Sequence, residues 1–359
     1  MPSPNWQPGE PAPWFLARTQ ANPRFCFDSM GGRYIVLTFF RSTSDPLAQQ
    51  FFAALEGLRF LFDDENVCFF GVSIDPQDEA LGRVNDSLPG VRFFFDTDFA
   101  VSTANGVGSA AGGYACATFI LDERLRIVRM IPLVEDPTAH VNQIIETLRG
   151  LPLLAPPAAA NMQAPVLIVP RVFEPEFCRK LIDFYNERGG QESGFMREVQ
   201  GKTVQVFDYN HKRRRDEEIT DEEFRRACMV RIHNRLVPEL KKAFQFEATR
   251  IERYVVACYE AETAGHFRAH RDNTTKGTAH RRFAVSLMLN TGEYEGGEVC
   301  FPEYGRQRYA APAGGAVVFS CSLLHEALPV TRGKRYVFLP FLYDESGAKI
   351  RQQNQQYLA

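Results

Sequence analysis

Residues 317–341, VVFSCSLLHEALPVTRGKRYVFLPF, decide how the second half of this chain folds. Two apolar runs rich in Val and Phe flank a segment with proline and glycine, which is typical of short strands joined by turns. The same rhythm extends upstream through RYVVACY (253–259), RRFAVSLMLN (281–290) and GEVCFP (297–302). Short, closely spaced strands with Gly-rich turns predict an antiparallel double sheet of the jelly-roll kind.

Two helical stretches precede these strands. Residues 174–188 carry a proline near the first helical position and end before Gly189-Gly190, the usual start and stop signals of a helix. Residues 221–246 are expected to form a second helical stretch, bent at Pro238. We therefore expect a mainly β, double-stranded β-helix domain with flanking helices.

The first half alternates strands and helices. Apolar, β-branched runs at 33–40, 67–75 and 91–96 are typical of strands buried on both faces. A helix is expected over 47–62, a hairpin over 117–133 and a closing helix over 138–148. This order predicts an α/β sandwich of the thioredoxin type.

A Pro- and Ala-rich stretch, LPLLAPPAAANMQA (151–164), separates the two halves. Consecutive prolines block a helix and favour extended chain, so we interpret it as a linker. The 359 residues thus divide into a domain at 1–150, a linker at 151–164 and a domain at 165–359.

Composition narrows the function classes. The formal net charge is −3, so no basic field predicts a nucleic-acid partner. No secretory signal and no membrane span are recognised, and the eight scattered cysteines are expected to be reduced and mostly buried in a cytoplasmic protein. The run KRRR (212–215), followed at once by DEE (216–218), is expected to be solvated, with an anionic partner left open.

The stretch HFRAHRDN (266–273) has three chemical readings. A protein-kinase loop needs an asparagine where Gly277 stands, and no DFG follows. A zinc-protease helix needs a glutamate where Phe267 stands. The remaining reading is a His270-x-Asp272 pair of the non-haem iron type, which requires a second, distant histidine.

His325, in the strand-rich stretch quoted first, supplies that histidine. Arg335 follows ten residues later, where a strand can direct it toward a dicarboxylate. Lys334 is the neighbouring cation, but its side chain should face the other side of the strand. His270, Asp272 and His325 are therefore the expected metal ligands and catalytic centre.

This constellation resembles the Fe(II)/2-oxoglutarate dioxygenases, and most closely their prolyl 4-hydroxylase-like branch, over residues 165–345. The resemblance implies that Arg335 holds the distal carboxylate of 2-oxoglutarate and that Tyr259 helps to seat this cosubstrate. It implies Fe(II), 2-oxoglutarate and O2, with ascorbate as a supporting reductant. The implied reaction hydroxylates a C–H bond of a protein, a peptide (prolyl included) or an amino-acid-like small molecule and releases succinate and CO2.

Residues 8–150 resemble the thioredoxin/peroxiredoxin superfamily through PGEPAPWF, YIVLTFF, FFGVSID and ATFILDERLRIV. That family places its reactive cysteine in the loop at 41–47, which here reads RSTSDPL. A redox-inactive module that recruits substrate, supports the fold or forms a homodimer is therefore expected. Two alternatives stay open: a thiol peroxidase using Cys26 or Cys68, and a non-catalytic interaction protein.

Overall fold

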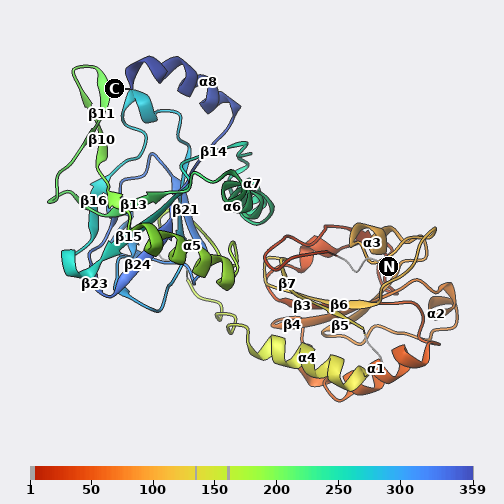
Figure 1. The fold of residues 1–359 in the computed structure, drawn as a ribbon. Helices are drawn as coiled ribbons and strands as arrows, with labels where there is room; N and C mark the ends of the chain where they lie inside the picture. Colours follow the sequence, from red (N-terminus) through yellow and green to blue (C-terminus); the bar gives the residue numbers. More distant parts are fainter. Residues whose placement is uncertain (1–4, 134–135, 160–161, 359) are drawn as a thin grey trace. The chain divides into compact units, whose positions relative to one another are not determined.

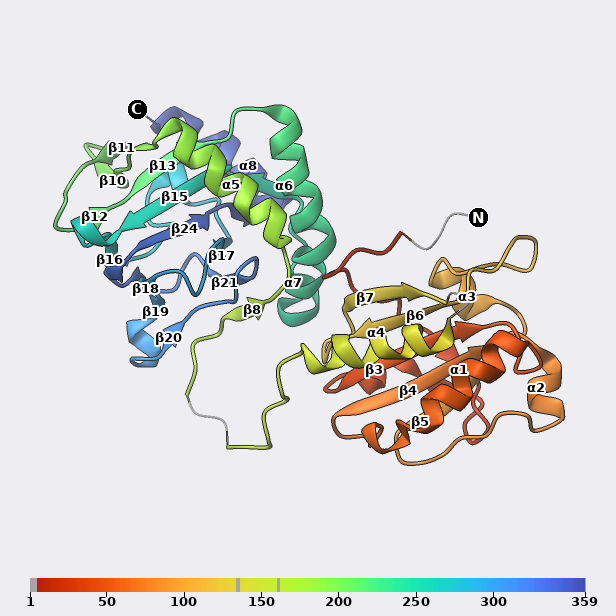
Figure 2. The same cartoon turned by 60° about the horizontal axis from the view of Figure 1, so that its bottom comes forward.

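The computed structural model describes residues 5–133, 136–159 and 162–358. The chain folds as two compact units, Met1–Ala158 and Ala159–Ala359. Figures 1 and 2 show their elements from two directions. No helix in the described ranges is long and apolar enough to cross a bilayer.

The domain limits expected from the sequence, at residues 150 and 165, stay predictions. Positions 160 and 161 of the expected linker lie outside the described residues, as do the first four residues and the last.

The first unit is built on a mixed sheet with the strand order β5-β4-β3-β6-β7. The three strands β3, β4 and β5 are parallel, and β6 and β7 complete the sheet as an antiparallel hairpin. The predicted thioredoxin-like α/β fold is therefore confirmed. The strands are β3 (Tyr34–Phe40), β4 (Val67–Ser73), β5 (Val91–Phe95), β6 (Ala117–Leu121) and β7 (Ile127–Pro132).

Strand β3 is buried along its whole length because both faces of the sheet are covered. Val36 and Phe40 pack in the core that includes α1 (Pro46–Glu56) and α4 (Pro137–Arg149). Alternate residues pack in the opposite core, which includes α3 (Ala100–Ala104). Figure 1 shows α1 and α4 together on one face of the sheet and α3 on the other. Because both faces of β3 are buried, every residue of the strand is in a core, and its sequence is apolar almost throughout and not alternating.

Helix α1 differs from its prediction at both ends. The Asp45 carboxylate, not the Ser44 hydroxyl, caps the helix by accepting from the Leu47 amide at 2.9 Å. The helix ends at Glu56 and not at residue 62, and a 3-10 turn follows Gly57. Glycine has a low helix propensity, so it ends a helix that the apolar spacing alone would continue.

The second unit contains two facing sheets. The larger has the order β14-β25-β17-β24-β15-β13-β9, with β21 and β8 joined to β17, and the smaller has the order β12-β16-β22-β19-β20. The predicted jelly-roll architecture is confirmed. The strands of the larger sheet are β8 (Leu167–Val169), β9 (Gln191–Glu192), β13 (Arg215–Glu218), β14 (Arg250–Glu252), β15 (Val255–Glu260), β17 (Phe283–Met288), β21 (Ala316–Ser320), β24 (Lys334–Phe338) and β25 (Phe341–Tyr343). Those of the smaller sheet are β12 (Lys212–Arg213), β16 (His266–His270), β19 (Val299–Cys300), β20 (Arg308–Tyr309) and β22 (His325–Ala327).

Alternation along β15 separates two cores of this unit. Val256 and Cys258 pack toward α5 (Pro175–Arg188), α6 (Glu222–Arg235) and α7 (Val237–Phe244), which cover the outer face of the larger sheet. Ala257 and Tyr259 face the space between the sheets. The helices α6 and α7 meet at Leu236, close to the expected bend. The interior between the sheets is where polar side chains then gather.

Three features of this unit were not predicted from the sequence. A hairpin formed by β10 (Phe195–Val199) and β11 (Lys202–Val206) projects from the unit, and α8 (Glu345–Asn354) follows the last strand. The run 334–343 is not one strand, because Pro340 separates β24 from β25. Proline lacks the amide hydrogen that a continuous ladder needs.

Candidate metal centre and its pocket

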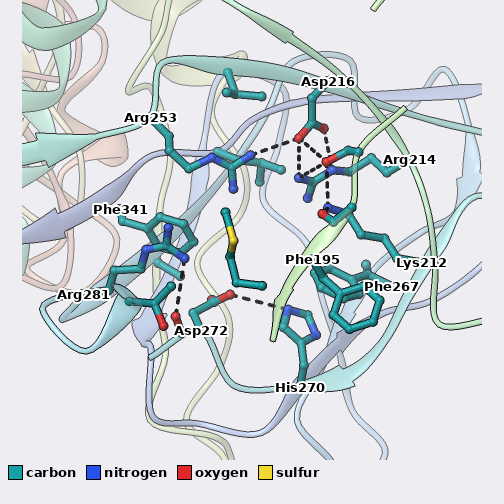
Figure 3. Close-up of a pocket in the computed structure, with 18 of the residues that line it drawn as sticks. Phe195, Lys212, Arg214, Asp216, Arg253, Phe267, His270, Asp272, Arg281 and Phe341 are labelled. Carbon is teal, nitrogen blue, oxygen red and sulfur yellow. Dashed lines mark hydrogen bonds and ion pairs between the residues drawn. The ribbon is translucent and has the colours of Figure 1, made fainter. Parts of the chain in front are cut away.

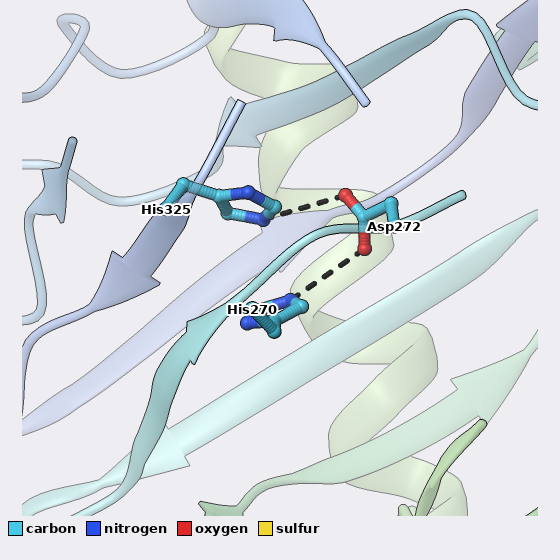
Figure 4. A group of neighbouring side chains, drawn as sticks. All are labelled: His270, Asp272 and His325. Atoms are coloured by element: carbon cyan, nitrogen blue, oxygen red, sulfur yellow. Dashed lines mark ion pairs between the residues drawn. The ribbon is translucent and has the colours of Figure 1, made fainter. Parts of the chain in front are cut away.

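Three side chains from two neighbouring strands of the smaller sheet converge on one point. His270 ends β16, His325 begins β22, and these two residues are partners in the antiparallel register. Asp272 follows β16 directly, and its carboxylate oxygens lie 3.5 Å from His270 Nε2 and 3.3 Å from His325 Nε2 (Figure 4). The three ligand atoms lie within 4.8 Å of one another. Such spacing fits three adjacent ligands of one ion at about 2.1 Å.

Backbone carbonyls orient both imidazole rings. His270 Nδ1 lies 2.7 Å from the Arg268 carbonyl, and His325 Nδ1 lies 3.0 Å from the Leu323 carbonyl. Each carbonyl can only accept, so each Nδ1 carries a hydrogen, and Nε2 is the ring nitrogen that faces Asp272. A carbonyl behind the ring fixes the tautomer that a metal needs.

Burial and neighbouring charges shift the pKa values of His325 and Asp272. Burial lowers the pKa of His325 to about 4, so the ring is neutral at pH 7. Burial by itself would raise the pKa of Asp272, but His325, His270 and Arg281 outweigh it and hold the pKa well below its usual range. A carboxylate and two imidazoles form the donor set of the 2-His-1-carboxylate facial triad.

Aromatic rings surround the two histidines. The Phe267 ring stacks on the His270 ring at 3.5 Å between centroids, and the Phe319 ring lies 4.5 Å from the His325 ring. Phe301 completes this layer at 6.3 Å from His325. These rings restrict the imidazoles and limit access of water on that side.

Arg335 lies on β24 of the opposite sheet and is only 1% exposed. Its Nη2 donates to Ser286 Oγ at 3.0 Å, while Nε has no hydrogen-bond partner. Its guanidinium lies 4.9 Å from the centre of the Tyr259 ring, and these residues are register partners. Lys334 faces away, as expected, and pairs with Glu260 at 2.7 Å. A buried guanidinium with an unpartnered nitrogen is suited to a carboxylate ligand.

One cavity of about 960 Å³ joins these groups. It is lined by the three candidate metal ligands, by Arg335 and by Tyr259, among others. Figure 3 shows His270 and Asp272 on one side of this cavity and a group of cations on the other. The structure therefore brings every site residue expected from the sequence to a single pocket.

The family comparison bears on this pocket directly. Residues 254–343, which include all five of these residues, match the 2OG-Fe(II) oxygenase superfamily. The C-terminal unit contains a 2OG-Fe(II) oxygenase domain. The family takes Fe(II), 2-oxoglutarate and O2, and the His-Asp-His cluster and the buried arginine are chemically suited to the first two.

Curated relatives of the oxygenase domain are PKHD-type hydroxylases. The chain is 40% identical over 94 residues to one from a Polaromonas species and 39% identical over 90 residues to one from Pseudomonas fluorescens. These matches cover 24% and 23% of this chain and 39% of each relative. The chain thus spans about two-fifths of the length of the curated relatives it matches.

The N-terminal unit contains an AhpC/TSA domain, since residues 8–130 match that family. Among solved structures, Mycobacterium tuberculosis AhpC is 21% identical over 41% of this chain and 93% of its own, with a TM-score of 0.34. A viral collagen prolyl hydroxylase from Paramecium Bursaria Chlorella virus-1 is 15% identical over 49% of this chain and 94% of its own, with a TM-score of 0.38.

The charged run 212–218 of the oxygenase domain is solvated only in part, so the expectation is wrong for Lys212 and Arg214. Lys212 and Arg214 are 5% and 7% exposed, and both line the cavity together with Asp216. Alternate residues of an extended segment face opposite sides, so Arg213 and Arg215 take the outward positions. Charged residues usually lie at the surface, but in this segment the alternation directs Lys212 and Arg214 into the cavity.

His211 and Arg281 also line the oxygenase cavity. The His211 ring lies 4.5 Å from the Phe195 ring and 5.5 Å from the Phe267 ring. No signal in the sequence distinguishes it from other histidines. Of the neighbouring residues Arg281 and Arg282, Arg281 is the one that lines the cavity, and it binds Glu252 at 2.8 Å.

The cysteines are all free thiols and most are buried, but Cys26 differs from the others. Cys26 is exposed at the end of the short strand β2 (Phe25–Cys26) and is no core residue. Cys68 is buried in β4, where burial and the neighbouring Asp64 raise its pKa to about 12. In the loop before α1, the Ser42 and Thr43 hydroxyls donate to Asp75 and Asp78, both at 2.6 Å.

Proposed function

We propose that the C-terminal unit is a Fe(II)- and 2-oxoglutarate-dependent hydroxylase that oxidises a C–H bond and releases succinate and CO2. The observation that carries this proposal is the meeting of His270, Asp272 and His325 in one cavity with the buried cation Arg335. Either feature alone has a structural explanation, since histidines and arginines also serve in cores. Together they provide a metal site and a dicarboxylate site for one reaction centre.

In this proposal, His270, Asp272 and His325 hold iron(II), and the bound metal supplies the oxygen chemistry of the hydroxylation. The chain orients the ligands through the two backbone carbonyls behind the imidazoles. The stacked Phe267 ring shields His270 from water. A dry, shaped site confines a reactive oxidant to the intended substrate bond.

Arg335 binds the distal carboxylate of 2-oxoglutarate in this proposal, with Ser286 and Tyr259 beside it. Nη2 donates to Ser286 Oγ at 3.0 Å and to Met288 Sδ at 3.5 Å, while none of the described residues accepts a hydrogen bond from Nε, so this buried cation has no carboxylate partner of its own. Gly297 supports this arrangement, because a Cβ at that position would lie 2.7 Å from Arg335 Cδ. The missing side chain leaves room for the arginine to extend.

The substrate is proposed to be a protein or peptide residue or an amino-acid-like molecule. The hydroxylase name of the curated relatives supports hydroxylation, and the cavity volume is large enough for a cosubstrate and a substrate group together. The β10–β11 hairpin contributes Phe195 and Met196 to the lining, so it lies where a substrate would enter. The eight free thiols support a reducing compartment such as the cytoplasm.

For the N-terminal unit we propose a role without thiol chemistry. The loop RSTSDPL (41–47) has hydroxyls where the resembled family has its thiol, and Cys68 is held as an unreactive thiol. Deleting residues 1–158 and measuring turnover of a substrate found for the full chain tests a recruiting role. Unchanged turnover by the truncated chain would contradict that role and leave the hydroxylase proposal intact.

The decisive experiment is an anaerobic titration of the full chain with Fe(II) and then 2-oxoglutarate. We expect the metal-to-ligand charge-transfer absorption of the ternary complex with the wild-type chain and its loss with His270→Ala. His233→Ala is the matched control, since His233 is an exposed histidine of α6. Absence of the absorption from the wild-type chain, or its retention by His270→Ala, refutes the proposal.

A further inference from the structure

A second group of charged side chains lies in the oxygenase cavity, apart from the candidate metal ligands. Lys212, Arg214 and Asp216 come from the alternating run on β12 and β13, and Arg253 comes from the connection between β14 and β15. Figure 3 shows these four side chains together, across the cavity from Asp272. We refer to Lys212, Arg214 and Arg253 as the cation group.

The cation group is only partly neutralised. Asp216 binds Arg214 through two contacts of 2.6 Å and Arg253 through one of 3.0 Å, so one carboxylate serves two guanidiniums. Lys212 Nζ donates only to neutral acceptors, Ser193 Oγ at 2.7 Å and the Gly194 carbonyl at 2.5 Å. Within the described part of the chain, no carboxylate forms an ion pair with Lys212.

An uncompensated buried cation is costly to the folded state. Burial and the neighbouring Arg214 hold the pKa of Lys212 well below its ordinary value, which reflects that cost. The two hydrogen bonds explain the position of the ammonium group but do not balance its charge, which a hydrophobic side chain of similar length would not carry. An excess of positive charge in a cavity is instead the usual arrangement for capturing an anion.

The backbone at Arg253 adds an independent indication. This residue has φ of 67°, in the left-handed region that non-glycine residues rarely adopt. The conformation carries the guanidinium toward Asp216, while the side chain stays 29% exposed. Strained residues of this kind are concentrated at ligand sites. Arg253 therefore combines a fixed orientation with a surface still open to the cavity.

The cation group is separated from the candidate cosubstrate arginine by one aromatic ring. The guanidiniums of Arg214 and Arg335 lie 5.7 Å and 4.9 Å from the centre of the Tyr259 ring. Lys212 Nζ lies 4.9 Å from the Phe267 ring, which stacks on His270. The cavity thus has two separate groups of cations, and only the Phe267 ring lies between Lys212 and the candidate metal ligand His270.

We propose that Lys212 and Arg253 bind an oxyanion of the substrate, a carboxylate or a phosphate, so that the oxygenase domain acts on an acidic substrate. Arg214 is committed to Asp216 and acts as a positioning residue for Arg253. The identification of the bound anion as part of the substrate rests on the proposed hydroxylase function. Binding of an anion at Lys212 and Arg253 does not, because it needs no metal. It places the acidic group on the side of the cavity opposite Asp272 and leaves the bond to be hydroxylated between them.

The test uses acetate and inorganic phosphate as probes of the full chain with 2-oxoglutarate present, so that the Arg335 position is filled. The line widths of the 13C signal of acetate and the 31P signal of phosphate report binding. Lys212→Met and Arg253→Gln should each weaken binding of the preferred probe at least roughly tenfold, as for one charge-assisted hydrogen bond. Arg213→Met, which removes an exposed neighbouring charge, should leave binding unchanged. The probe that broadens more identifies the oxyanion.

Adding Mn(II) then tests where the probe binds. Paramagnetic broadening of the bound probe in the wild-type chain, lost in both variants, supports an anion position beside the metal centre. Equal broadening in the wild-type chain and in both variants, or no broadening of either probe by the wild-type chain, overturns the proposal. If Mn(II) itself does not bind, the proposed function fails while the metal-free line widths still decide the anion position. Retained 2-oxoglutarate binding shows that a variant has folded.

Discussion

Replacement of Arg335 by lysine tests the cosubstrate site most directly. Lysine keeps the positive charge and most of the length, so the buried charge balance is preserved. It loses the planar fork that can bind a carboxylate through two parallel hydrogen bonds. Because Arg335 is 1% exposed, solvent cannot replace the lost contact.

The size of the effect follows from these contacts. One hydrogen bond to a charged group contributes about 1.5–3 kcal/mol, and each 1.4 kcal/mol is a factor of ten in Kd. Arg335→Lys should therefore weaken binding of 2-oxoglutarate roughly 10- to 150-fold. Binding of Fe(II) should be unchanged, because Arg335 lies on β24 and the candidate ligands belong to the smaller sheet.

The assay is the anaerobic titration of the Fe(II)-loaded chain with 2-oxoglutarate, followed by charge-transfer absorption. Lys334→Met is the matched control: this neighbouring cation is exposed, pairs with Glu260 and should change Kd less than about twofold. Wild-type affinity in Arg335→Lys would refute the assignment. If Lys212→Met lost affinity instead, the anion position at Lys212 would be the cosubstrate site.

Three further outcomes are expected. Gly297→Ala should weaken 2-oxoglutarate binding, because its Cβ would lie 2.7 Å from Arg335 Cδ. Gly292→Ala should not weaken binding, because Gly292 also has a positive φ but has no atom within 4 Å of the added Cβ. Calorimetric titration of both variants with 2-oxoglutarate therefore separates the contact with Arg335 from the backbone strain that the two variants share. Burial alone would raise the pKa of Glu174, but Arg235 and Arg231 outweigh it and lower the pKa from 4.5 to about 2. The ionised carboxylate should therefore contribute about 2 kcal/mol to the free energy of unfolding above pH 4.5, and this contribution should be lost as the pH falls toward 2. Unfolding of Glu174→Gln, measured over the same pH series, should show no such loss. A thiol reagent at pH 7.5 should modify the exposed Cys26 in a fast phase and the buried Cys68 only when the chain unfolds. The fast phase of modification should disappear in Cys26→Ser. Its persistence in that variant would contradict the exposure of Cys26.

The cluster of candidate metal ligands and the buried Arg335 beside them were predictable because their chemistry restricts residue type and spacing. His270 and Asp272 are two apart, and His325 and Arg335 follow on later strands, an order that few other sites require. Strand alternation alone also distinguishes Arg335 from Lys334. Local backbone geometry acts over a few residues, so a local pattern can carry this information.

The buried state of the cation group was not predictable in the same way. The run from Lys212 to Glu218 carries the usual mark of a surface, since charge is expensive to bury. Alternation identifies which of its side chains share a face, but not whether that face meets water or a cavity. That depends on β15 and β16, which pair with the run from about forty residues or more along the chain.

The sequence by itself thus determined the two fold classes, the candidate metal ligands and the side of β24 on which the cosubstrate cation lies. Each depends on periodicity or on residue chemistry, which the chain carries locally. Only the tertiary structure decided that His211 and the cation group line the same cavity, that Gly297 makes room for Arg335, and that Cys26 is exposed. These features depend on which distant surfaces are brought together, and that is a property of the closed sheets and not of any one stretch of sequence.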